Sequence, residues 1–357
     1  MTFWIGFVFT VPVLVLHLAL PEAARVSPLA ALEADPEAIE ALTVGSSHGR
    51  DIYYPAMGLT GHALSEDAGD INTADLKLRA AISRLPNLKY VFMPVSPVLL
   101  TYDRRIGDPG DWLVHRSWLR NTPMPGEGAA ITTSERLTLW STRLASLEPF
   151  IRVNEISKNA VTRLVRGALG GVDDKIDAQA CHVIENPPDF PHEYGIRNGF
   201  QRTPLPADCI PRASEMNAWN HLHHADGSLT AKPEIRAENL VHLTRMAKAA
   251  REAGLQLIFF VPPVTQAYYE TPELLRHWEI ERPLIEELAE REGARFVDFH
   301  DFFWSGAYRT KNAVFVDGNH LTIHGAAVFS EALARELEIG SGADVFAETE
   351  TESDLRN

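Results

Sequence analysis

The feature that most constrains the fold is an alternation of short apolar runs with amphipathic segments in the second half of the chain. Residues 256–263 (QLIFFVPP) and 294–299 (ARFVDF) are strand-like runs, and helical patterns at 233–253, 272–293 and 323–337 surround them. A nearly continuous apolar run is typical of a strand that is buried on both faces of a parallel sheet. The alternation therefore predicts an α/β fold, a three-layer sandwich around a mainly parallel sheet.

The first half carries the same alternation more sparsely. Residues 41–45 (ALTVG) predict a first strand, and residues 88–95 (LKYVFMPV) predict a strand in the middle of the sheet. Between them, residues 73–85 have helical spacing, with Asn72 or Thr73 as the expected N-cap. Near the end of the domain, residues 312–317 (NAVFVD) predict a further strand or the approach to one.

A long insertion, residues 104–232, separates the two halves. Its first part predicts helices at 133–147 and 154–169, and its second part, 170–232, is rich in turn residues. Such long segments inside a compact domain are usually functional or disordered. We expect one domain over residues 23–340 that includes this insertion, followed by a disordered acidic tail at 341–357.

The N-terminus is a separate apolar segment. Residues 3–20 (FWIGFVFTVPVLVLHLAL) contain no Asp, Glu, Lys or Arg, and their 18 positions reach the lower limit for crossing a hydrocarbon core. We expect residues 1–22 to form an uncleaved membrane anchor that holds the domain on the periplasmic or extracellular side. A cleaved signal peptide and a buried helix are the alternatives.

The net charge limits the classes of partner that the protein can bind, and the cysteines bear on the compartment in which it folds. The formal net charge is −15, from 48 acidic and 33 basic residues, without a basic cluster, which excludes nucleic acid as an expected partner. Cys181 and Cys209 are the 2 cysteines. Behind an export signal they predict a disulfide, which would stabilise the irregular segment by roughly 3–4 kcal/mol; two unrelated buried thiols are the alternative.

Two short motifs carry residues of catalytic type. In VGSSHGRD, residues 44–51, Ser46 and Ser47 directly follow the first predicted strand, and ligands of open α/β sheets bind at the carboxyl ends of strands. A turn that begins there points free N–H groups at the serine, where they can stabilise an oxyanion. Gly and Ser after a strand are also ordinary turn residues, so this motif is informative only together with a base.

The second motif, VDGNHLTIHG, supplies that base. Asp317 and His320 are three residues apart, a spacing that lets the carboxylate hold the imidazole ring so that its other nitrogen faces a serine hydroxyl. His324 is a rival base four residues later, without an Asp at the matching spacing. The two motifs together predict a Ser–His–Asp triad.

With these motifs the chain resembles the SGNH/GDSL hydrolase superfamily, whose fold is flavodoxin-like. Gly45-Ser46-Ser47 corresponds to the family's first block, and Asp317 to His320, with Gly325 after it, corresponds to the last. The resemblance implies Ser47, Asp317 and His320 as catalytic residues, with Ser47 favoured over Ser46 as the nucleophile.

The family's oxyanion hole is matched only in part. Residues 58–61 resemble its second block, which implies an oxyanion donor at Gly61 beside the N–H of Ser47. The family's third block supplies an Asn after the middle strand, but this chain has Ser96 there, and Ser46 replaces the Asp of the first block. Ser96 is therefore the expected third donor, and a backbone N–H group is the alternative.

The closer resemblance is to envelope acyl-transfer branches of the superfamily, such as alginate O-acetylation proteins and the protein that assists teichoic-acid D-alanylation. It implies a cofactor-free serine esterase or O-acyltransferase that acts on an acylated envelope glycan or polymer, with a membrane acyl-donor protein as a partner. A catalytically degenerate fold that binds carbohydrate or scaffolds an export complex is the alternative, because the Asn is missing.

Further candidates lie near these motifs and in the insertion. His48 and Trp219 are expected to contact substrate, with a solvated turn histidine as the alternative for His48. Trp219 with Tyr194 and Phe200 predicts either a sugar-stacking surface or ordinary packing. A histidine cluster close by allows a metal site or a solvated loop, and because no second ligand group has a recognised zinc spacing, we expect no metal. That cluster consists of His221, His223 and His224, with Asp226 beside it.

Overall fold

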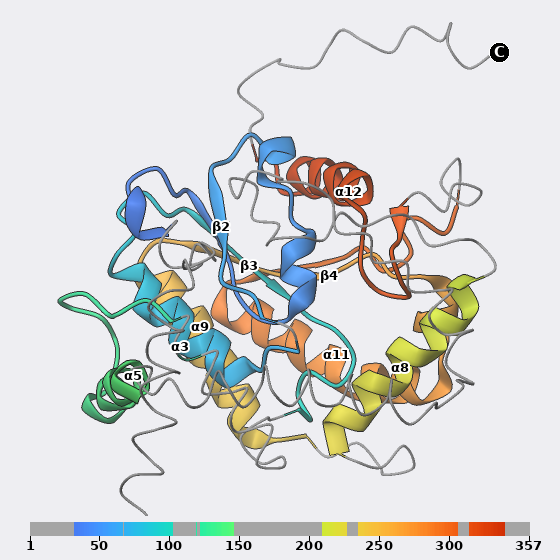
Figure 1. Ribbon diagram of the computed structural model, residues 1–357, viewed down its shortest axis with the longest axis horizontal. Coiled ribbons are helices and arrows are strands. Elements are labelled where there is room, and N and C mark those ends of the chain that lie inside the picture. The colour runs from blue at the N-terminus through green and yellow to red at the C-terminus, as the bar shows by residue number, and fades with distance from the viewer. Residues whose placement is uncertain are drawn as a thin grey trace, which may run out of the picture.

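The computed structural model describes residues 32–66, 68–102, 119, 122–145, 209–226, 235–305 and 314–339. Its centre is a five-stranded parallel sheet with the strand order β2-β1-β3-β4-β5 (Figure 1). The strands are β1 (Ala41–Thr43), β2 (Gly61–Ala63), β3 (Tyr90–Pro94), β4 (Gln256–Val261) and β5 (Arg295–Asp298). The predicted α/β class is confirmed.

Helices cover both faces of the sheet, as Figure 1 shows. On one face lie α3 (Ile71–Ile82), α9 (Ala237–Glu252) and α11 (Pro272–Glu292). On the other lie α12 (Ile323–Glu336) and two short 3₁₀ helices, η1 (Ser47–Asp51) and η2 (Tyr54–Met57). Successive strand residues point to opposite faces, so Phe259 belongs to the first core and its neighbours Ile258 and Phe260 to the second.

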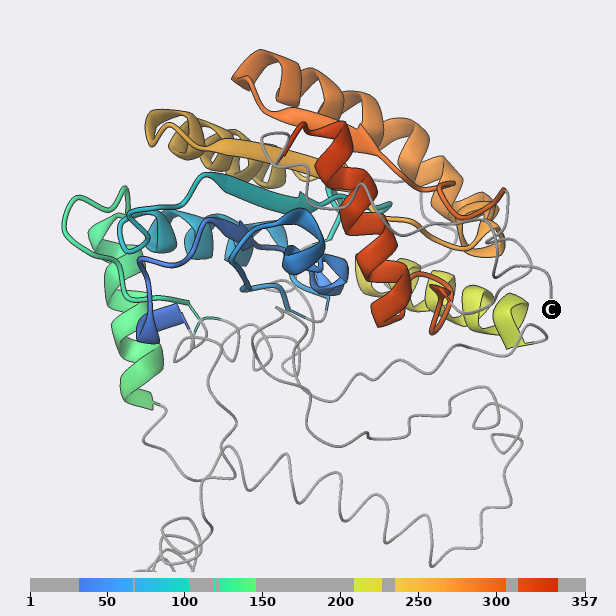
Figure 2. The same cartoon turned by 90° about the horizontal axis from the view of Figure 1, so that it is seen from above.

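Three further helices lie beside this sandwich. They are α5 (Thr133–Ala145), α8 (Ile210–Asp226) and α10 (Gln266–Tyr269). The 17-residue helix α8 corrects the sequence-based expectation that residues 170–232 are all turn-rich. Figure 2 shows α8 beside the segment that leads into α12.

Two local expectations were wrong. Asp70 caps α3, because its carboxylate accepts a hydrogen bond from the Thr73 N–H at 2.8 Å, so the helix begins before the expected Asn72 or Thr73 cap. Residues 314–317 form no sheet strand, and Phe315 instead makes an isolated antiparallel bridge with Leu321. That bridge closes the turn between them.

The strand order places a switch point at β1 and β3. The chain passes from β1 to β2 on one side and then returns to β3 on the other, and ligands of such sheets bind outside the carboxyl ends at this point. Ser46 and Ser47 follow β1 there, and Ser96 follows β3. The chain leaves β1 through Gly45, whose φ of 107° is a conformation that favours glycine.

Several expectations fall on residues outside the described ranges. These include the membrane segment 1–22, the helix at 154–169 and the tail 341–357. Of the helices that the structure describes, none has the length and apolar character needed to cross a membrane. Cys209 is buried directly before α8, whereas Cys181 is not described, so their disulfide stays a prediction.

A buried carboxyl group on α11 predicts a pH-dependent stability. Glu281 is fully buried and accepts the Leu100 N–H at 3.0 Å, and burial raises the pKa of its carboxyl above the ordinary value. A raised folded-state pKa means that its stabilising contribution is complete below the unfolded-state pKa and is lost as the pH rises through the folded-state pKa. Glu281→Gln keeps an acceptor for Leu100 but cannot ionise. The measurement that tests this is the melting temperature of Glu281→Gln minus that of the wild type at two pH values. This difference should be more positive at pH 8 than at pH 4, and a difference that does not change with pH would contradict the expectation.

Candidate active site

Ser47 begins the 3₁₀ helix η1, two residues beyond Gly45. This places its backbone N–H in the first turn of η1, where N–H groups lack acceptors within the helix. The turn lies tightly against the sheet, because a Cβ on Gly49 would overlap the side chains of Ser65 and Thr43. The serine is thus held at the carboxyl end of β1, with its side chain partly exposed.

Ser47, His320 and Asp317 form one continuous chain of side-chain contacts. The Ser47 Oγ lies 2.8 Å from the His320 Nε2, and the His320 Nδ1 lies 2.9 Å from the Asp317 Oδ2. The other carboxylate oxygen of Asp317 accepts the backbone N–H groups of Asn319 at 2.9 Å and His320 at 2.8 Å. This is the geometry in which a carboxylate orients an imidazole that can accept a serine proton.

The start of α12 fixes the turn that carries His320. Thr322 caps the helix by accepting the Gly325 N–H at 3.0 Å. A Cβ on Gly325 would overlap the carbonyl oxygen of Val314, so only glycine permits this close approach of the two segments. The local sequence therefore explains why the base lies just before the helix rather than within it.

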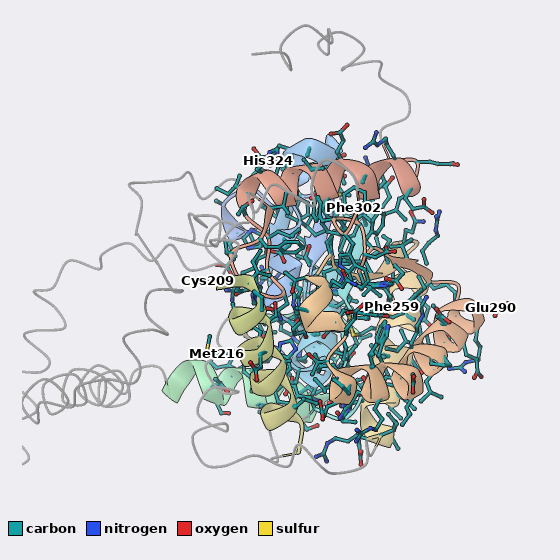
Figure 3. The ribbon with its side chains drawn as sticks, turned by 90° about the vertical axis from the view of Figure 1, so that its right-hand side faces the viewer. Cys209, Met216, Phe259, Glu290, Phe302 and His324 are labelled. Carbon is teal, nitrogen blue, oxygen red and sulfur yellow. The ribbon has the colours of Figure 1, made fainter. Side chains whose placement is uncertain are left out.

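The alternatives to Ser47 and His320 lie elsewhere. The Ser46 Oγ lies 3.2 Å from the His48 Nδ1, so it contacts a different histidine from Ser47. His324 is exposed in the first turn of α12, at the edge of the molecule in Figure 3. The structure thus brings Ser47, His320 and Asp317 together, and it does not bring His324 to them.

His48 is placed differently from its expected role. Its side chain is 1% exposed, and its ring stacks on that of His320 with centroids 5.0 Å apart and planes 17° from parallel. Burial behind the base does not fit the predicted contact with substrate. The ring instead supports one face of His320.

The prediction that Gly61 is an oxyanion donor was wrong. Gly61 pairs with Ala41 at the amino end of β1, whereas Ser47 follows the carboxyl end of that strand. At about 3.3 Å per residue the two lie at opposite ends of the sheet. Its lack of a side chain has another cause, because a Cβ there would overlap the ring of Tyr54.

A different glycine, Gly69, lies near the carboxyl end of β1. It lies against the turn after β1, where a Cβ would overlap the Gly45 carbonyl oxygen, and its N–H donates to the Glu66 carbonyl at 3.0 Å. It directly precedes Asp70, the N-cap of α3.

Ser96 lines a cavity at the carboxyl ends of β1 and β3, and its predicted role as an oxyanion donor stays a prediction. Most of the lining surface is apolar, and serine and histidine side chains are among the groups that line it. The lining residues are Ser46, Ala68, Gly69, Ser96, Val98, Leu99, Tyr102 and His221.

The insertion contributes to the site through α8. The Asn217 Nδ2 donates to the Asn319 Oδ1 at 2.6 Å, and the His221 Nδ1 lies 2.6 Å from the Tyr268 hydroxyl. Burial raises the pKa of the Tyr268 phenol, so this hydroxyl stays protonated. Neither Asn217 nor Tyr268 was a sequence candidate, because nothing in the sequence joins them to residues so distant along the chain.

The remaining candidates in the insertion are only partly described. His221 is in α8, but the side chains of Trp219, His223, His224 and Asp226 lie outside the described residues, as do Tyr194 and Phe200. No group of three or more His, Cys, Asp or Glu side chains within the described ranges is arranged to hold a metal ion.

Comparisons with known proteins add no relative to this picture. No protein-family model matches the sequence, and no curated protein is similar enough to it to indicate a relationship. The arrangement of side chains is therefore the basis on which a function can be assigned.

Proposed function

We propose that this protein is a serine esterase or O-acyltransferase of the SGNH type that forms an acyl-enzyme on Ser47. The observation that carries the proposal is the contact chain from the Ser47 Oγ through His320 to Asp317, with distances of 2.8 and 2.9 Å. A serine hydroxyl is a weak nucleophile on its own and becomes active when a correctly oriented base accepts its proton. These three groups have the identities, order and spacing for that chemistry.

In the proposed reaction the Ser47 Oγ attacks the carbonyl carbon of an acyl ester while His320 Nε2 takes the serine proton. The imidazolium is stabilised by Asp317 and then gives its proton to the departing alkoxide, which leaves an acyl-serine. Water or a sugar hydroxyl next loses a proton to His320 and attacks the acyl carbon, and the serine is restored. The same residues serve hydrolysis and transfer.

The cavity beside Ser46 is the proposed binding site for the acyl group of the substrate. Val98, Leu99 and Ala68 give it an apolar lining next to the nucleophilic turn. The N–H of Ser47 and the hydroxyl of Ser96 are the proposed oxyanion donors, because both follow strands at this edge.

We further propose an acylated envelope glycan or polymer as the substrate and a membrane acyl-donor protein as the partner. This part depends on the apolar segment 3–20 and on the sequence resemblance to envelope acyl-transfer proteins. Under this proposal the domain lies at the outer face of a membrane.

A second candidate is a degenerate hydrolase fold that binds carbohydrate. Two observations favour it: Ser96 stands where the family has an Asn, and the Gly69 N–H is already hydrogen-bonded to the Glu66 carbonyl. Loss of one oxyanion donor can lower a rate by about 10²–10³-fold. The intact contacts of Ser47 and His320 favour the enzyme.

The two candidates differ in what Ser47→Ala does to the hydrolysis of 4-nitrophenyl acetate. For the enzyme we expect loss of at least about 10³-fold in kcat, because the Ser47 Oγ is the hydroxyl that lies against the His320 Nε2. The melting temperature should be nearly unchanged, since Ser47 is outside both cores. Ser46→Ala is the matched control, and loss of activity in that variant alone would move the nucleophile to Ser46.

A further inference from the structure

We propose that helix α8 of the insertion is a positioning element for the catalytic base, and that Asn217 is its principal positioning residue. This inference rests on the proposed function and adds to it a part of the chain that the triad motifs do not include. The turn from Asp317 to His320 is only four residues long, and α8 contacts the two residues between its catalytic ends, Gly318 and Asn319.

The contact of α8 with Gly318 is a close approach of backbones. A Cβ on Gly318 would overlap the Cα of Ser214 in α8. On the other side, the N–H and the hydroxyl of Thr265 both donate to the Gly318 carbonyl, at 2.9 and 2.8 Å, and the Thr265 Oγ1 lies 2.7 Å from the Ser214 Oγ. The middle of the turn is therefore enclosed by α8 and by the segment that leads into α10.

The contact with Asn319 is a side-chain hydrogen bond. The Asn319 side chain is buried and receives the Asn217 Nδ2 at 2.6 Å. Its own amide nitrogen faces the His221 Nε2 at 3.4 Å, while the backbone N–H of Asn319 donates to Asp317. Holding this side chain thus fixes the peptide that immediately precedes His320 and orients the carboxylate that holds the ring.

His221 extends the same support to the face of the base. Its ring makes an edge contact with that of His48, with centroids 5.8 Å apart, and His48 in turn stacks on His320. Tyr268 anchors His221 from the side of α10. The base is thus held by Asp317 on its own turn, by His48 from η1 and, through these contacts, by two residues of α8.

Helix α8 lies more than 90 residues before His320 in the sequence, and Cys209 and Met216 in Figure 3 mark its course along one side of the core. A helix that only filled space there would not need an amide side chain that donates to the buried Asn319 of the catalytic turn. The polar contacts instead make the geometry of His320 depend on the insertion.

The experiment compares Asn217→Ala with Glu215→Ala in the full chain, using 4-nitrophenyl acetate. Glu215 is exposed on the same helix and serves as the matched control. We expect Asn217→Ala to lower kcat by about 10²-fold with KM changed less than twofold, because misplacement of a reacting group by about 1 Å can have that effect. Glu215→Ala should match the wild type. In a His320→Ala background, Asn217→Ala should cause no further loss, since its effect passes through His320.

A proton NMR measurement of the same variants needs no activity. A histidine Nδ1–H held by a carboxylate gives a resolved downfield signal, which is assigned by its loss in His320→Ala. We expect this signal in the wild type and in Glu215→Ala, and its loss or broadening by exchange in Asn217→Ala. His221→Gln is the second variant, for use if Asn217→Ala does not fold, and it should weaken the signal in the same way.

The possible failures are distinguishable. An unchanged signal and unchanged kcat in folded Asn217→Ala and His221→Gln would overturn the inference, as would a rise in KM alone. A wild-type protein that shows the histidine signal but neither hydrolyses the ester nor reacts with a fluorophosphonate would overturn the proposed function while leaving the positioning role open to the NMR comparison.

Discussion

Replacing His320 by Ala is expected to lower kcat for a small acyl ester by at least about 10⁴-fold, because the Ser47 hydroxyl then has no base to accept its proton. Asp317 acts on the reaction by orienting and charging His320, since its carboxylate contacts the His320 Nδ1 rather than Ser47. Adding Asp317→Asn to His320→Ala should therefore cost little more. Steady-state kinetics of the two single variants and the double variant measure this non-additivity.

The control for that cycle is His324→Ala, which removes an exposed histidine one helical turn away. It should retain wild-type activity. The activity of the wild type should also rise with pH, because the base must be neutral to accept a proton. Additive losses in the cycle, or full activity in His320→Ala, would place the base elsewhere.

The second large effect is on stability. Asp75 of α3 is fully buried and contacts three cationic or polar partners: Arg79 at 2.6 Å, His242 at 2.8 Å and Arg245 at 3.6 Å. Asp75→Ala leaves the buried Arg79 guanidinium with Glu135, at 2.7 Å, as its remaining carboxylate, and the loss of one carboxylate from a buried ion-pair cluster is expected to cost up to about 3–5 kcal/mol. We expect a loss of that size in the free energy of unfolding, measured by urea denaturation.

A surface ion pair provides the comparison for Asp75. Lys248 and Glu252 of α9 are 3.7 Å apart, with both side chains 61% exposed. Glu252→Ala should change the free energy of unfolding by less than about 1 kcal/mol, because solvent screens such pairs. Equal effects of Asp75→Ala and Glu252→Ala would show that the buried cluster is not a source of stability.

The parts of the fold that the sequence predicted are those with a strong local pattern. β3 and β4 are continuous apolar runs, and α11 ends at Gly293, whose φ of 75° makes it a natural terminator. β2 was missed because it is three residues, GHA, at the edge of the sheet, too short for any periodicity. Its place in the sheet follows from its pairing with β1 rather than from its own composition.

The residues of the candidate site also differ in whether the sequence could predict them. Ser47 and His320 could be paired from the sequence because the serine motif directly follows a strand of the parallel sheet and the Asp-x-x-His motif directly precedes the last helix. Gly61 was misassigned because a glycine motif does not reveal at which end of a strand it lies. Asn217 could not be found, since its bond to Asn319 joins residues 102 positions apart across an insertion whose path the sequence does not specify.

The central claim is that Ser47 is a nucleophile activated by His320, and the most direct measurement is reaction with a fluorophosphonate probe followed by mass spectrometry of the peptides. The account predicts one adduct, on the peptide containing Ser46 and Ser47, with fragmentation that assigns it to Ser47. The adduct should persist in Ser46→Ala and disappear in Ser47→Ala and in His320→Ala. An unlabelled wild-type protein, or an adduct that survives in Ser47→Ala, would contradict it.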